Sequence, residues 1–385
     1  MYILLISRGY PSKNDPQWGC FERDQAEALG ELGHKVVMAS VDRRFRFYWR
    51  RIGFTHFVQN NINIYNSFLF PSAIVSLFSK KLDYIFYKYQ FNKLYDRIVK
   101  DHGTPDVIYS HYLYNTAQSV GLKNRNSTPL VAIEHWSELN ADNISLDIKN
   151  LGNIAYSDTD EIIAVSKSLS QRIKQHFSKE SVIINNMVNE SYFSDSVVLR
   201  KTDKKNFNFI TIGSLISRKD HRLLIYAFHK ANFGKNVTLS IVGGGKLKSE
   251  LQKQIKDLGL QNNVFLLGLK NKEEIRDILS KSDAFVLSSL AENFSVAVLE
   301  ALSVGLPCIA TLCGGTDECI SDKSGLLVPI KDTDKLSTAM VQMRNNYAQY
   351  DKQAIADDCK AKYSPEVIAK QIESVFNRVI ENRKR

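Results

Sequence analysis

Cysteine is scarce in this 385-residue sequence, and none of the five cysteines stands in a CxxC pair. We therefore expect neither a zinc site nor a disulfide framework, and an odd number of thiols is typical of a reducing compartment. No stretch of about 20 apolar residues occurs, so no membrane-spanning helix is expected. Residues 1–6 are too few for the apolar part of a signal peptide, and no basic leader accompanies them. These absences favour a cytoplasmic protein.

Acidic residues are missing from positions 43–82, a stretch that is basic and aromatic instead. Its charges are Arg43, Arg44, Arg46, Arg50, Arg51, Lys80 and Lys81, with rings such as Phe45, Tyr48 and Trp49 among them. Basic residues beside amphipathic rings suit an anionic bilayer, where each charge contributes about 1 kcal/mol. We predict that residues 43–81 contact an anionic membrane; the alternative is a solvated loop whose rings pack inward. Nucleic acid also attracts positive charge, but no nucleic-acid-binding motif is present, so no such partner is expected.

A dinucleotide fingerprint is missing as well. No GxGxxG follows the first predicted strand, so neither a nicotinamide nor a flavin cofactor is expected. The triplet Gly243-Gly244-Gly245 follows a predicted strand that ends at Val242, but three glycines alone are a weak sign of a dinucleotide.

Short apolar runs alternate with helical patterns along the whole chain, which predicts βαβ units and parallel sheets. The predicted strands are residues 2–6, 35–40, 106–110, 130–133, 161–165, 182–184, 207–212, 238–242, 264–267, 283–287, 308–311 and 325–328. We predict an α/β fold of two doubly wound Rossmann-like domains whose parallel sheets face a central cleft. The domains are residues 1–198 and 207–364, the lysine-rich interval 199–206 is a linker, and residues 365–385 form a helix that packs back on the first domain.

Two glutamates eight positions apart, Glu292 and Glu300, follow the predicted strand 283–287. Glu292 lies in the turn between that strand and a predicted helix, at the edge of the sheet where ligands bind. Two helical turns would place the carboxylates roughly 12 Å apart. The amides of Phe294 and Ser295 between them predict a seat for a diphosphate. This arrangement suits a nucleotide-sugar. The alternative is that Glu292 is an acidic residue at a helix start, favoured there by the helix dipole, and that Glu300 is a solvated helix residue.

The second half of the sequence resembles the retaining glycosyltransferases of the GT-B fold, specifically glycosyltransferase family 4. Besides the Glu-x7-Glu element, the resemblance lies in residues 305–310, 314–318 and 325–329. It implies that Glu292 lies near the hydroxyls of the donor sugar and that Glu300 binds the ribose hydroxyls. It also implies that Gly243 lies beside the nucleotide and that the backbone at Leu269 contacts the base.

Residues 212–220 resemble the family's glycine turn, with Arg218 and Lys219 facing the diphosphate. The physical argument is independent of the resemblance, because Gly213 permits a close approach of the backbone and two cations offset the charge of a leaving nucleotide. The alternative is a basic pair on the surface at the start of a helix.

The first half resembles the family less closely. Gly19 would approach the diphosphate or the acceptor, although it can also be an ordinary loop glycine. His111 and His135 each follow a predicted strand and would face the cleft. His135 matches the family's active-site histidine, which implies contact with the sugar, and His111 is a candidate for the acceptor side. Trp136 either stacks on a sugar or lipid, or packs internally.

The sequence departs from the family at two places, and it also contains two segments that have the form of metal sites in other glycosyltransferases. Only Asn186 and Val188 match in a segment that is usually Pro-Asn-Gly-Val-Asp, and Asn293 replaces a common glycine, which leaves the donor open. The Asp-x-Asp sequences at 158–160 and 332–334 have the form of metal sites in other glycosyltransferases. We interpret both as structural, the second as a helix cap. No metal is expected, because Arg218, Lys219 and helix amides would meet the diphosphate charge.

The sequence therefore predicts a retaining, metal-independent glycosyltransferase. The donor is a nucleotide-diphospho-sugar, and the acceptor is a glycan or a lipid-linked oligosaccharide such as those of capsule or lipopolysaccharide assembly, used at the inner face of the cytoplasmic membrane. Two alternatives stay open: a nucleotide-sugar epimerase of related shape, and a catalytically silent sugar-binding subunit. The donor sugar, the linkage and the oligomeric state are not readable from the sequence.

Overall fold

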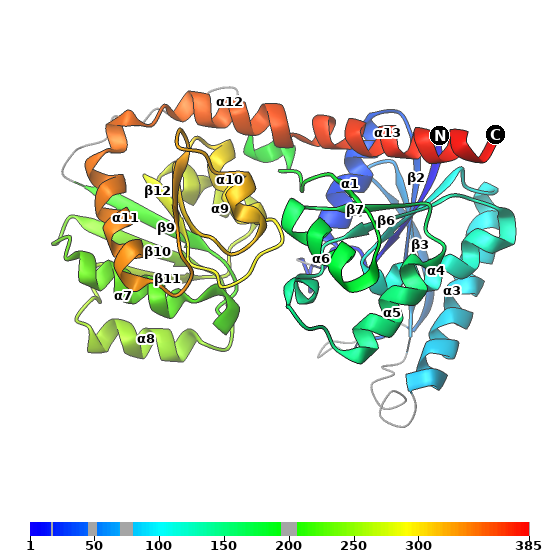
Figure 1. Cartoon of the computed structure of the whole chain (residues 1–385), viewed down its shortest axis with the longest axis horizontal. Coiled ribbons are helices and arrows are strands. Elements are labelled where there is room, and N and C mark those ends of the chain that lie inside the picture. The colour runs from blue at the N-terminus through cyan, green and yellow to red at the C-terminus, as the bar shows by residue number, and fades with distance from the viewer. Residues whose placement is uncertain (17, 45–51, 70–79, 194–205, 385) are drawn as a thin grey trace. The chain divides into compact units, whose positions relative to one another are not determined.

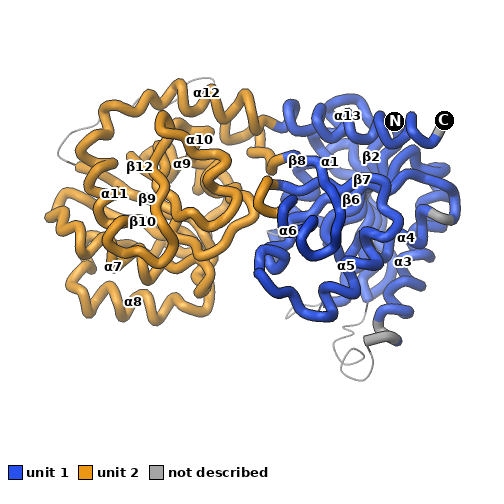
Figure 2. The backbone as a smooth tube through the Cα atoms, in the orientation of Figure 1, with its two compact units in different colours: residues 1–165, 170–184, 365–385 blue, residues 166–169, 185–364 orange. Residues whose placement is uncertain are grey.

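The chain divides into two compact units, shown in blue and orange in Figure 2. The computed structural model describes residues 1–16, 18–44, 52–69, 80–193 and 206–384. Unit 1 comprises Met1–Val165, Ser170–Ile184 and Pro365–Arg385, and unit 2 comprises Ser166–Leu169 and Asn185–Ser364. The predicted linker lies almost wholly outside the described residues.

Unit 1 is built on an eight-stranded sheet of order β3-β4-β2-β1-β5-β6-β7-β8. The strands are β1 (Tyr2–Ser7), β2 (Lys35–Asp42), β3 (Gly53–Gln59), β4 (Ile62–Phe68), β5 (Val107–His111), β6 (Leu130–Glu134), β7 (Glu161–Ala164) and β8 (Val182–Ile183). All neighbouring strands pair in parallel except β3 and β4. The strand order reverses at β1 and β5, because β2 continues on one side of this pair and β6 on the other.

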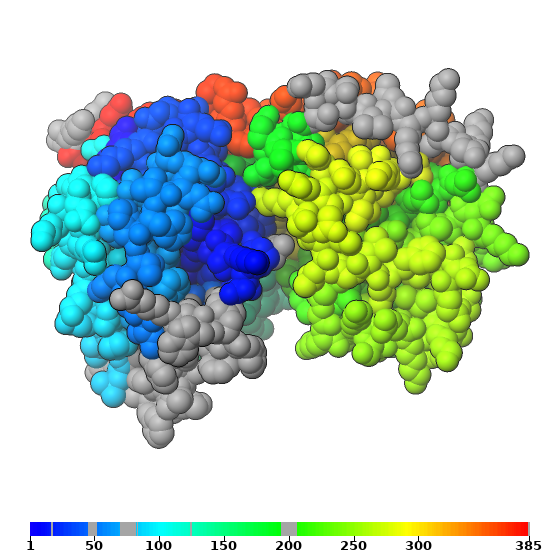
Figure 3. Space-filling model, turned by 180° about the vertical axis from the view of Figure 1, so that it is seen from behind, coloured from blue at the N-terminus to red at the C-terminus, as the bar shows by residue number. Residues whose placement is uncertain are grey.

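Helices cover both faces of the unit 1 sheet, which explains why its central strands β1, β5 and β6 are buried at every position. The helices are α1 (Cys20–Glu31), α3 (Lys80–His102), α4 (Leu113–Asn126), α5 (Leu146–Ser157), α6 (Lys167–Phe177) and α13 (Pro365–Lys384), labelled in Figure 1. α1 packs on β1 and β2 and also against α13. α3 packs on β2 and β4, and α4 packs on β5 and β6. α3 lies at the surface of unit 1, where Figure 3 draws it in cyan.

The hairpin of β3 and β4 was not predicted. Its turn is made by Asn60 and Asn61, which both have positive φ, 49° and 60°. Asparagine tolerates this conformation, and paired positive φ values are what a tight hairpin turn requires. The hairpin adds an antiparallel edge to a parallel sheet. It occupies part of the stretch for which we predicted membrane contact; residues 45–51 and 70–79 of that stretch lie outside the described residues.

Unit 2 is built on a six-stranded parallel sheet of order β11-β10-β9-β12-β13-β14. Its strands are β9 (Phe207–Ile212), β10 (Val237–Val242), β11 (Val264–Gly268), β12 (Ala284–Leu287), β13 (Cys308–Thr311) and β14 (Gly325–Val328). Its helices are α7 (His221–Ala231), α8 (Lys248–Asp257), α9 (Lys272–Ser280), α10 (Val296–Ser303), α11 (Thr333–Asn345) and α12 (Lys352–Tyr363).

The core of unit 2 lies on both faces of its sheet. On one face, Ala284 and Val286 of β12 belong to a buried cluster that includes residues of α7, α8 and α11. The alternate residues Phe285 and Leu287 are also buried, and α10 packs on β12 and β13. Burial on both faces makes a central strand such as β12 a continuous apolar run in the sequence.

The predicted fold class is confirmed: each unit is a Rossmann-like domain with a parallel sheet, and each predicted strand is present to within two residues. The first boundary differs: apart from Ser166–Leu169, unit 2 begins at Asn185 and not after residue 198. The reason is local bonding: Val188 N donates to Tyr363 O, and Asn186 Nδ2 donates to Phe294 O.

The helix α13 belongs to unit 1, although α12 directly before it belongs to unit 2. Phe376 of α13 is fully buried and lies edge-on to the Tyr109 ring of β5. Glu373 Oε1 lies 2.9 Å from His34 Nε2. Among the described helices, none combines the length and the apolar character needed to cross a bilayer.

Candidate active site

The loops that leave β9 and β12 meet where the strand order of the unit 2 sheet reverses. β9 and β12 are neighbours, with β10 and β11 on one side and β13 and β14 on the other. In open α/β sheets, ligands bind at the carboxyl ends of the strands beside such a reversal. The loop after β9 carries Arg218 and Lys219, and the loop after β12 carries Glu292. The fold therefore brings together the two cations and the first glutamate that the sequence singled out.

Glu292 forms an ion cluster with both cations. Its Oε1 lies 2.5 Å from Lys219 Nζ, and its Oε2 lies 3.3 Å from Arg218 Nη1. The side chains of Glu292 and Lys219 are 9% and 14% exposed, whereas that of Arg218 is 37% exposed. Two cations face one carboxylate, so the cluster keeps a net positive charge. An anion can reach this charge from solvent on the Arg218 side.

Backbone hydrogen bonds hold the cluster in place. Leu290 N donates to the carbonyl of Arg218 at 2.8 Å, which joins the loop after β12 to the loop after β9. Glu292 N donates to the carbonyl of Cys313 at 2.7 Å, which joins it to the loop after β13. Three loops are thereby tied to one another, and groups fixed in this way need little reorganisation when a ligand arrives.

Gly243 is required by a close approach of two loops. It has a φ of 144°, and a Cβ at this position would lie 2.0 Å from the carbonyl oxygen of Gly213. A Cβ on Gly213 would in turn lie 3.3 Å from Cδ of Lys219. The two glycines that the sequence placed beside the nucleotide therefore let the loops after β9 and β10 pack against the lysine.

Leu269 lies beside this glycine turn. Its side chain is 79% exposed, and its Cγ would be 3.0 Å from a Cβ placed on Gly244. The structure thus brings Leu269, predicted to contact the base, next to the turn at Gly243, on the surface of unit 2.

The predicted seat for a diphosphate lies at the start of α10. Ser295 is the N-cap residue, and the first intrahelical hydrogen bonds come from Val298 and Leu299 to its carbonyl. The amides of Phe294 and Ser295 therefore precede the helical bonding pattern, while the Phe294 side chain is buried against the Tyr363 ring. Glu300 is half-buried in the second turn of α10.

His221 was missed by the sequence analysis. It is the first residue of α7, directly after the N-cap Asp220, and is 2% exposed. Burial lowers the pKa of His221 to about 4, and the charge of Lys219 adds to this shift. The ring lies against the backbone of Gly213 and Ser214. The sequence feature that could have identified His221 is its position two residues after Lys219.

In unit 1, the predicted residues His111 and His135 lie at the ends of the adjacent strands β5 and β6. Their rings stack with centroids 5.4 Å apart and an angle of 12° between planes. His111 is fully buried, and neither ring nitrogen has a hydrogen-bond partner among the residues that the structure describes. Burial lowers the pKa of His111 well below its usual range, and His135 and Arg8 lower it further. Because His135 is only half-buried, it alone of the two has surface to offer a ligand.

Glu134, also missed, organises the turn that carries His135 and Trp136. Its Oε1 accepts hydrogen bonds from the amides of these two residues at 2.9 and 2.7 Å. Its Oε2 accepts from Leu113 N at 2.7 Å and from the Tyr156 hydroxyl at 3.1 Å. Burial raises the pKa of Glu134, and these hydrogen bonds oppose the shift.

A pocket of about 320 Å³ lies in unit 1, at the carboxyl ends of its central strands. It is lined by Arg8, Trp18, Val41, Asp42, Arg43, Arg44, Tyr87, Tyr112, Tyr114, Asn115 and Trp136. Trp136, predicted on the acceptor side, lines this pocket, and so do Arg43 and Arg44 of the stretch for which we predicted membrane contact. The strand order reverses at β1 and β5, so the pocket occupies the same topological position in unit 1 as the ion cluster does in unit 2.

Arginine side chains and aromatic rings alternate around this pocket. The guanidinium of Arg8 lies 4.0 Å from the Tyr112 ring centroid and 4.8 Å from that of Trp18. The guanidinium of Arg43 lies 5.0 Å from the Tyr87 centroid and 5.1 Å from that of Tyr114. Such stacking holds the planar cations in fixed orientations.

Buried acidic partners fix two of these arginines. Arg8 Nε donates to Glu22, which is fully buried, at 2.8 Å. Burial alone would lower the pKa of Arg8, but Glu22 raises it above its ordinary value. Arg44 pairs with Asp42 at 2.8 Å. The pocket wall is therefore rigid and polar at two points and aromatic elsewhere.

Gly19 has a structural role. It is the N-cap residue of α1 with a φ of 79°, and a Cβ there would lie 2.0 Å from the carbonyl oxygen of Gly9. No larger residue fits between these two loops. Contact of Gly19 with a diphosphate or acceptor stays a prediction.

Both Asp-x-Asp sequences make local contacts. Asp158 and Asp160 face Lys123 at 2.6 and 3.3 Å. Asp332 caps α11 by accepting a hydrogen bond from Lys335 N. Within the described ranges, no three His, Cys, Asp or Glu side chains gather as metal ligands would.

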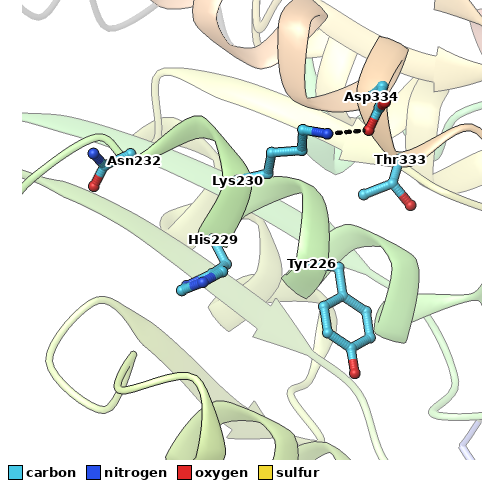
Figure 4. Close-up of a pocket in the computed structure, with 6 residues that line it drawn as sticks. All are labelled: Tyr226, His229, Lys230, Asn232, Thr333 and Asp334. Atoms are coloured by element: carbon cyan, nitrogen blue, oxygen red, sulfur yellow. Dashed lines mark hydrogen bonds and ion pairs between the residues drawn. The ribbon is translucent and has the colours of Figure 1, made fainter.

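A second hollow lies on unit 2, between the end of α7 and the start of α11 (Figure 4). It is lined by Tyr226, His229, Lys230, Asn232, Thr333 and Asp334. The ion pair of Lys230 and Asp334 spans it at 2.5 Å, and Tyr226 is exposed at its rim. None of the predicted site residues lines this hollow.

Both units match known protein families. Residues 23–192 match the family described as Glycosyltransferase Family 4, and residues 196–356 match Glycosyl transferases group 1. The chain belongs to glycosyltransferase family 4. The two matches together cover most of both units, and the second includes the ion cluster, so the protein is a glycosyltransferase.

Several curated relatives align with this family 4 glycosyltransferase. An uncharacterized glycosyltransferase of Methanocaldococcus jannaschii is 28% identical over 69% of this chain and 73% of its own length. N-acetyl-alpha-D-glucosaminyl L-malate synthase of Bacillus anthracis is 23% identical over 97% of both chains. A Campylobacter jejuni enzyme named as an N-acetylgalactosamine-N,N'-diacetylbacillosaminyl-diphospho-undecaprenol 4-alpha-N-acetylgalactosaminyltransferase is 29% identical over 52% of this chain and 54% of its own.

Solved structures share the fold. Sucrose-phosphate synthase from Thermosynechococcus elongatus superposes with a TM-score of 0.80, at 16% identity over 99% of both chains. HepE from Anabaena, solved in complex with UDP, superposes with a TM-score of 0.74, at 18% identity over 98% of this chain and 99% of its own. At such identities the likeness shows the fold alone, which is GT-B.

Proposed function

We propose that this glycosyltransferase moves a sugar from a nucleotide-diphospho-sugar to an acceptor hydroxyl and retains the anomeric configuration. The observation that carries the proposal is the ion cluster of Arg218, Lys219 and Glu292, at the point where the unit 2 sheet reverses its strand order. The leaving group of such a donor is a diphosphate, and an excess of fixed positive charge is what stabilises its departure.

Each member of the cluster has a distinct role in this proposal. Arg218 and Lys219 would hold the diphosphate, whose negative charge grows as its bond to the sugar breaks. Glu292, which both cations hold in place, would accept hydrogen bonds from the sugar hydroxyls. Glu300, in the second turn of α10, would bind the ribose hydroxyls, and His135 of unit 1 would position the sugar.

The bond changes balance without a covalent nucleophile on the protein. The bond between the anomeric carbon and the diphosphate oxygen breaks, and a bond to the acceptor oxygen forms on the same face. The proton of the acceptor hydroxyl moves to the leaving diphosphate oxygen. In this scheme Arg218 and Lys219 take the part that a divalent metal takes in other glycosyltransferases, and we propose that no metal is needed.

We further propose that the acceptor is a lipid-linked saccharide bound in the unit 1 pocket. Aromatic rings such as those of Tyr112 and Trp136 suit the apolar face of a sugar, and the arginines suit a linking phosphate. The Campylobacter jejuni relative is named for transfer onto a sugar carried by diphospho-undecaprenol, which supports this class of acceptor.

The experiment measures release of nucleoside diphosphate from UDP-, GDP- and ADP-sugars, with and without a polyprenyl-diphosphate-linked sugar. We expect one donor to be consumed only when the acceptor is present, and NMR to show the donor's anomeric configuration in the product. Conversion of the donor to an epimer without acceptor would instead establish an epimerase. No turnover of any donor would leave only a sugar-binding role.

Two variants separate the pocket from the rest of the surface. Trp136→Ala removes a ring from the pocket, and we expect the acceptor KM to rise about 3- to 10-fold, as the loss of one aromatic contact implies. Tyr226→Ala removes an exposed ring from the hollow of Figure 4 and serves as the matched control. Equal acceptor KM values in both variants would refute the assignment of the pocket.

A further inference from the structure

The exposed side of α3 changes character halfway along the helix. Tyr87, Phe91, Leu94 and Ile98 are 0–2% exposed and anchor the inner side in the unit 1 core. Opposite them in the first half stand apolar side chains: Leu82 is 60% exposed, Ile85 52%, Phe86 44% and Tyr89 52%. In the second half the outer residues are charged, and one of them, Asp96, pairs with Arg125.

The four exposed apolar residues form one continuous stripe. They follow the i, i+3, i+4, i+7 spacing that places side chains on a single helix face. A helix packed on a sheet normally presents polar residues to solvent, as the second half of α3 does. A contiguous exposed apolar surface of this kind marks a place where another molecule binds.

The sequence that carries the stripe is basic, which identifies the class of partner. Residues 80–93 contain Lys80, Lys81, Lys88 and Lys93 against the single acid Asp83. Lys93 Nζ lies 4.7 Å from the Tyr89 ring centroid, at the end of the stripe. Lysine is depleted where proteins bind one another, whereas basic residues beside exposed apolar and aromatic side chains are typical of helices that lie in the interface of an anionic bilayer.

We propose that the first half of α3 docks unit 1 onto an anionic membrane, with Leu82, Ile85, Phe86 and Tyr89 entering the headgroup region. This surface begins at Leu82, directly after the stretch 43–81 for which the sequence predicted membrane contact, and the proposal does not depend on the identity of the acceptor. It also has a consequence for the pocket: Tyr87, on the inner side of the same helix, lines the pocket wall. Docking through α3 would hold this pocket close to lipid headgroups, where a lipid-linked substrate resides.

The test is flotation of the full chain with vesicles of phosphatidylcholine alone and of phosphatidylcholine with 30% phosphatidylglycerol, a composition of roughly the charge found in anionic membranes. We expect binding to the anionic vesicles only. Ile85→Ser/Phe86→Ser should lower the partition coefficient at least about tenfold, since fully burying either side chain corresponds to about a tenfold gain or more. Lys88→Glu/Lys93→Glu should also release the protein, and binding of the unchanged chain should weaken as salt is raised.

The matched control is Leu146→Ser/Ile154→Ser on α5, which removes two exposed apolar side chains from the same unit, 72% and 43% exposed. It should float like the unchanged chain. Thermal unfolding and gel filtration of each variant test whether the fold is kept. The proposal is overturned if the unchanged chain ignores anionic vesicles, or if the α3 variants bind as well as the control. It is also overturned if the α3 variants change only self-association in sedimentation velocity, because the stripe would then be an interface between copies.

Discussion

Replacing Lys219 with methionine removes the cation closest to Glu292 and keeps a side chain of similar length. The structure predicts two separable effects, one on stability and one on catalysis. Because the two side chains are only 14% and 9% exposed, their separation leaves a largely buried carboxylate. Breaking a buried pair costs about 3–5 kcal/mol, and we expect the lower value because Arg218 remains 3.3 Å from Glu292.

The catalytic effect follows from the loss of charge at the leaving group. Removing one preorganised group that stabilises developing charge lowers kcat about 10²- to 10³-fold. Donor KM should change much less, because the interaction strengthens as the bond breaks. Nucleoside diphosphate release under donor saturation measures kcat, and urea unfolding measures the free energy of unfolding.

A double variant distinguishes the two effects. In Lys219→Met/Glu292→Gln the buried charge is gone, so stability should return to within about 1 kcal/mol of the unchanged chain. Activity should not return, because both groups act on the donor. Lys253→Met, which removes an exposed lysine of α8, is the control and should change neither quantity. The reasoning fails if Lys219→Met keeps kcat within threefold, or if the double variant regains activity together with stability.

Three further predictions concern single residues. Glu300→Gln should raise the donor Kd, measured by calorimetry, and leave kcat nearly unchanged, since a ribose contact is equal in ground and transition states; an unchanged Kd would reject the ribose role. Glu134 accepts four hydrogen bonds through two oxygens, whereas the glutamine in Glu134→Gln accepts only through one, so the free energy of unfolding should fall by about 2 kcal/mol or more. The exposed control Glu138→Gln should change it by less than about 0.5 kcal/mol. The pKa of His221 is lowered to about 4 in the fold, whereas its ordinary value is near 6.5. Below pH 6.5 the unfolded chain therefore takes up a proton that the folded chain does not. The free energy of unfolding should fall by about 3 kcal/mol as the pH falls from 6.5 toward 4. Urea unfolding at pH 7 and pH 4.5 should show a smaller pH dependence for His221→Phe, and an equal dependence would contradict the assignment.

The strands and the donor-side residues could be predicted because their signals are local. A parallel strand covered on both faces must be apolar at every position, as β12 is, and the residues that follow it reach the edge where ligands bind. Arg218, Lys219 and Glu292 follow such strands directly. Their place in the sequence therefore determines their place in the fold, and the structure adds that they bond to one another.

The remaining features depend on residues that are distant in sequence. In the sequence, Glu134 is indistinguishable from any residue at the end of a strand. Its hydrogen-bond donors Leu113 and Tyr156 lie 21 and 22 positions away. The unit 1 pocket gathers Arg8, Arg43 and Trp136 from three different loops, so its alternation of cations and rings has no counterpart along the chain. The β3–β4 hairpin did have a local signal in Asn60-Asn61, which the basic and aromatic character of the surrounding stretch obscured.

The most direct test is a crystal structure of the protein with an uncleaved nucleotide-diphospho-sugar. The account predicts that diphosphate oxygens lie within about 3.2 Å of Lys219 Nζ and of the Arg218 guanidinium, with the sugar next to Glu292 and the ribose next to Glu300. A diphosphate bound elsewhere, with the Lys219–Glu292 pair unchanged and out of contact with the donor, would contradict it.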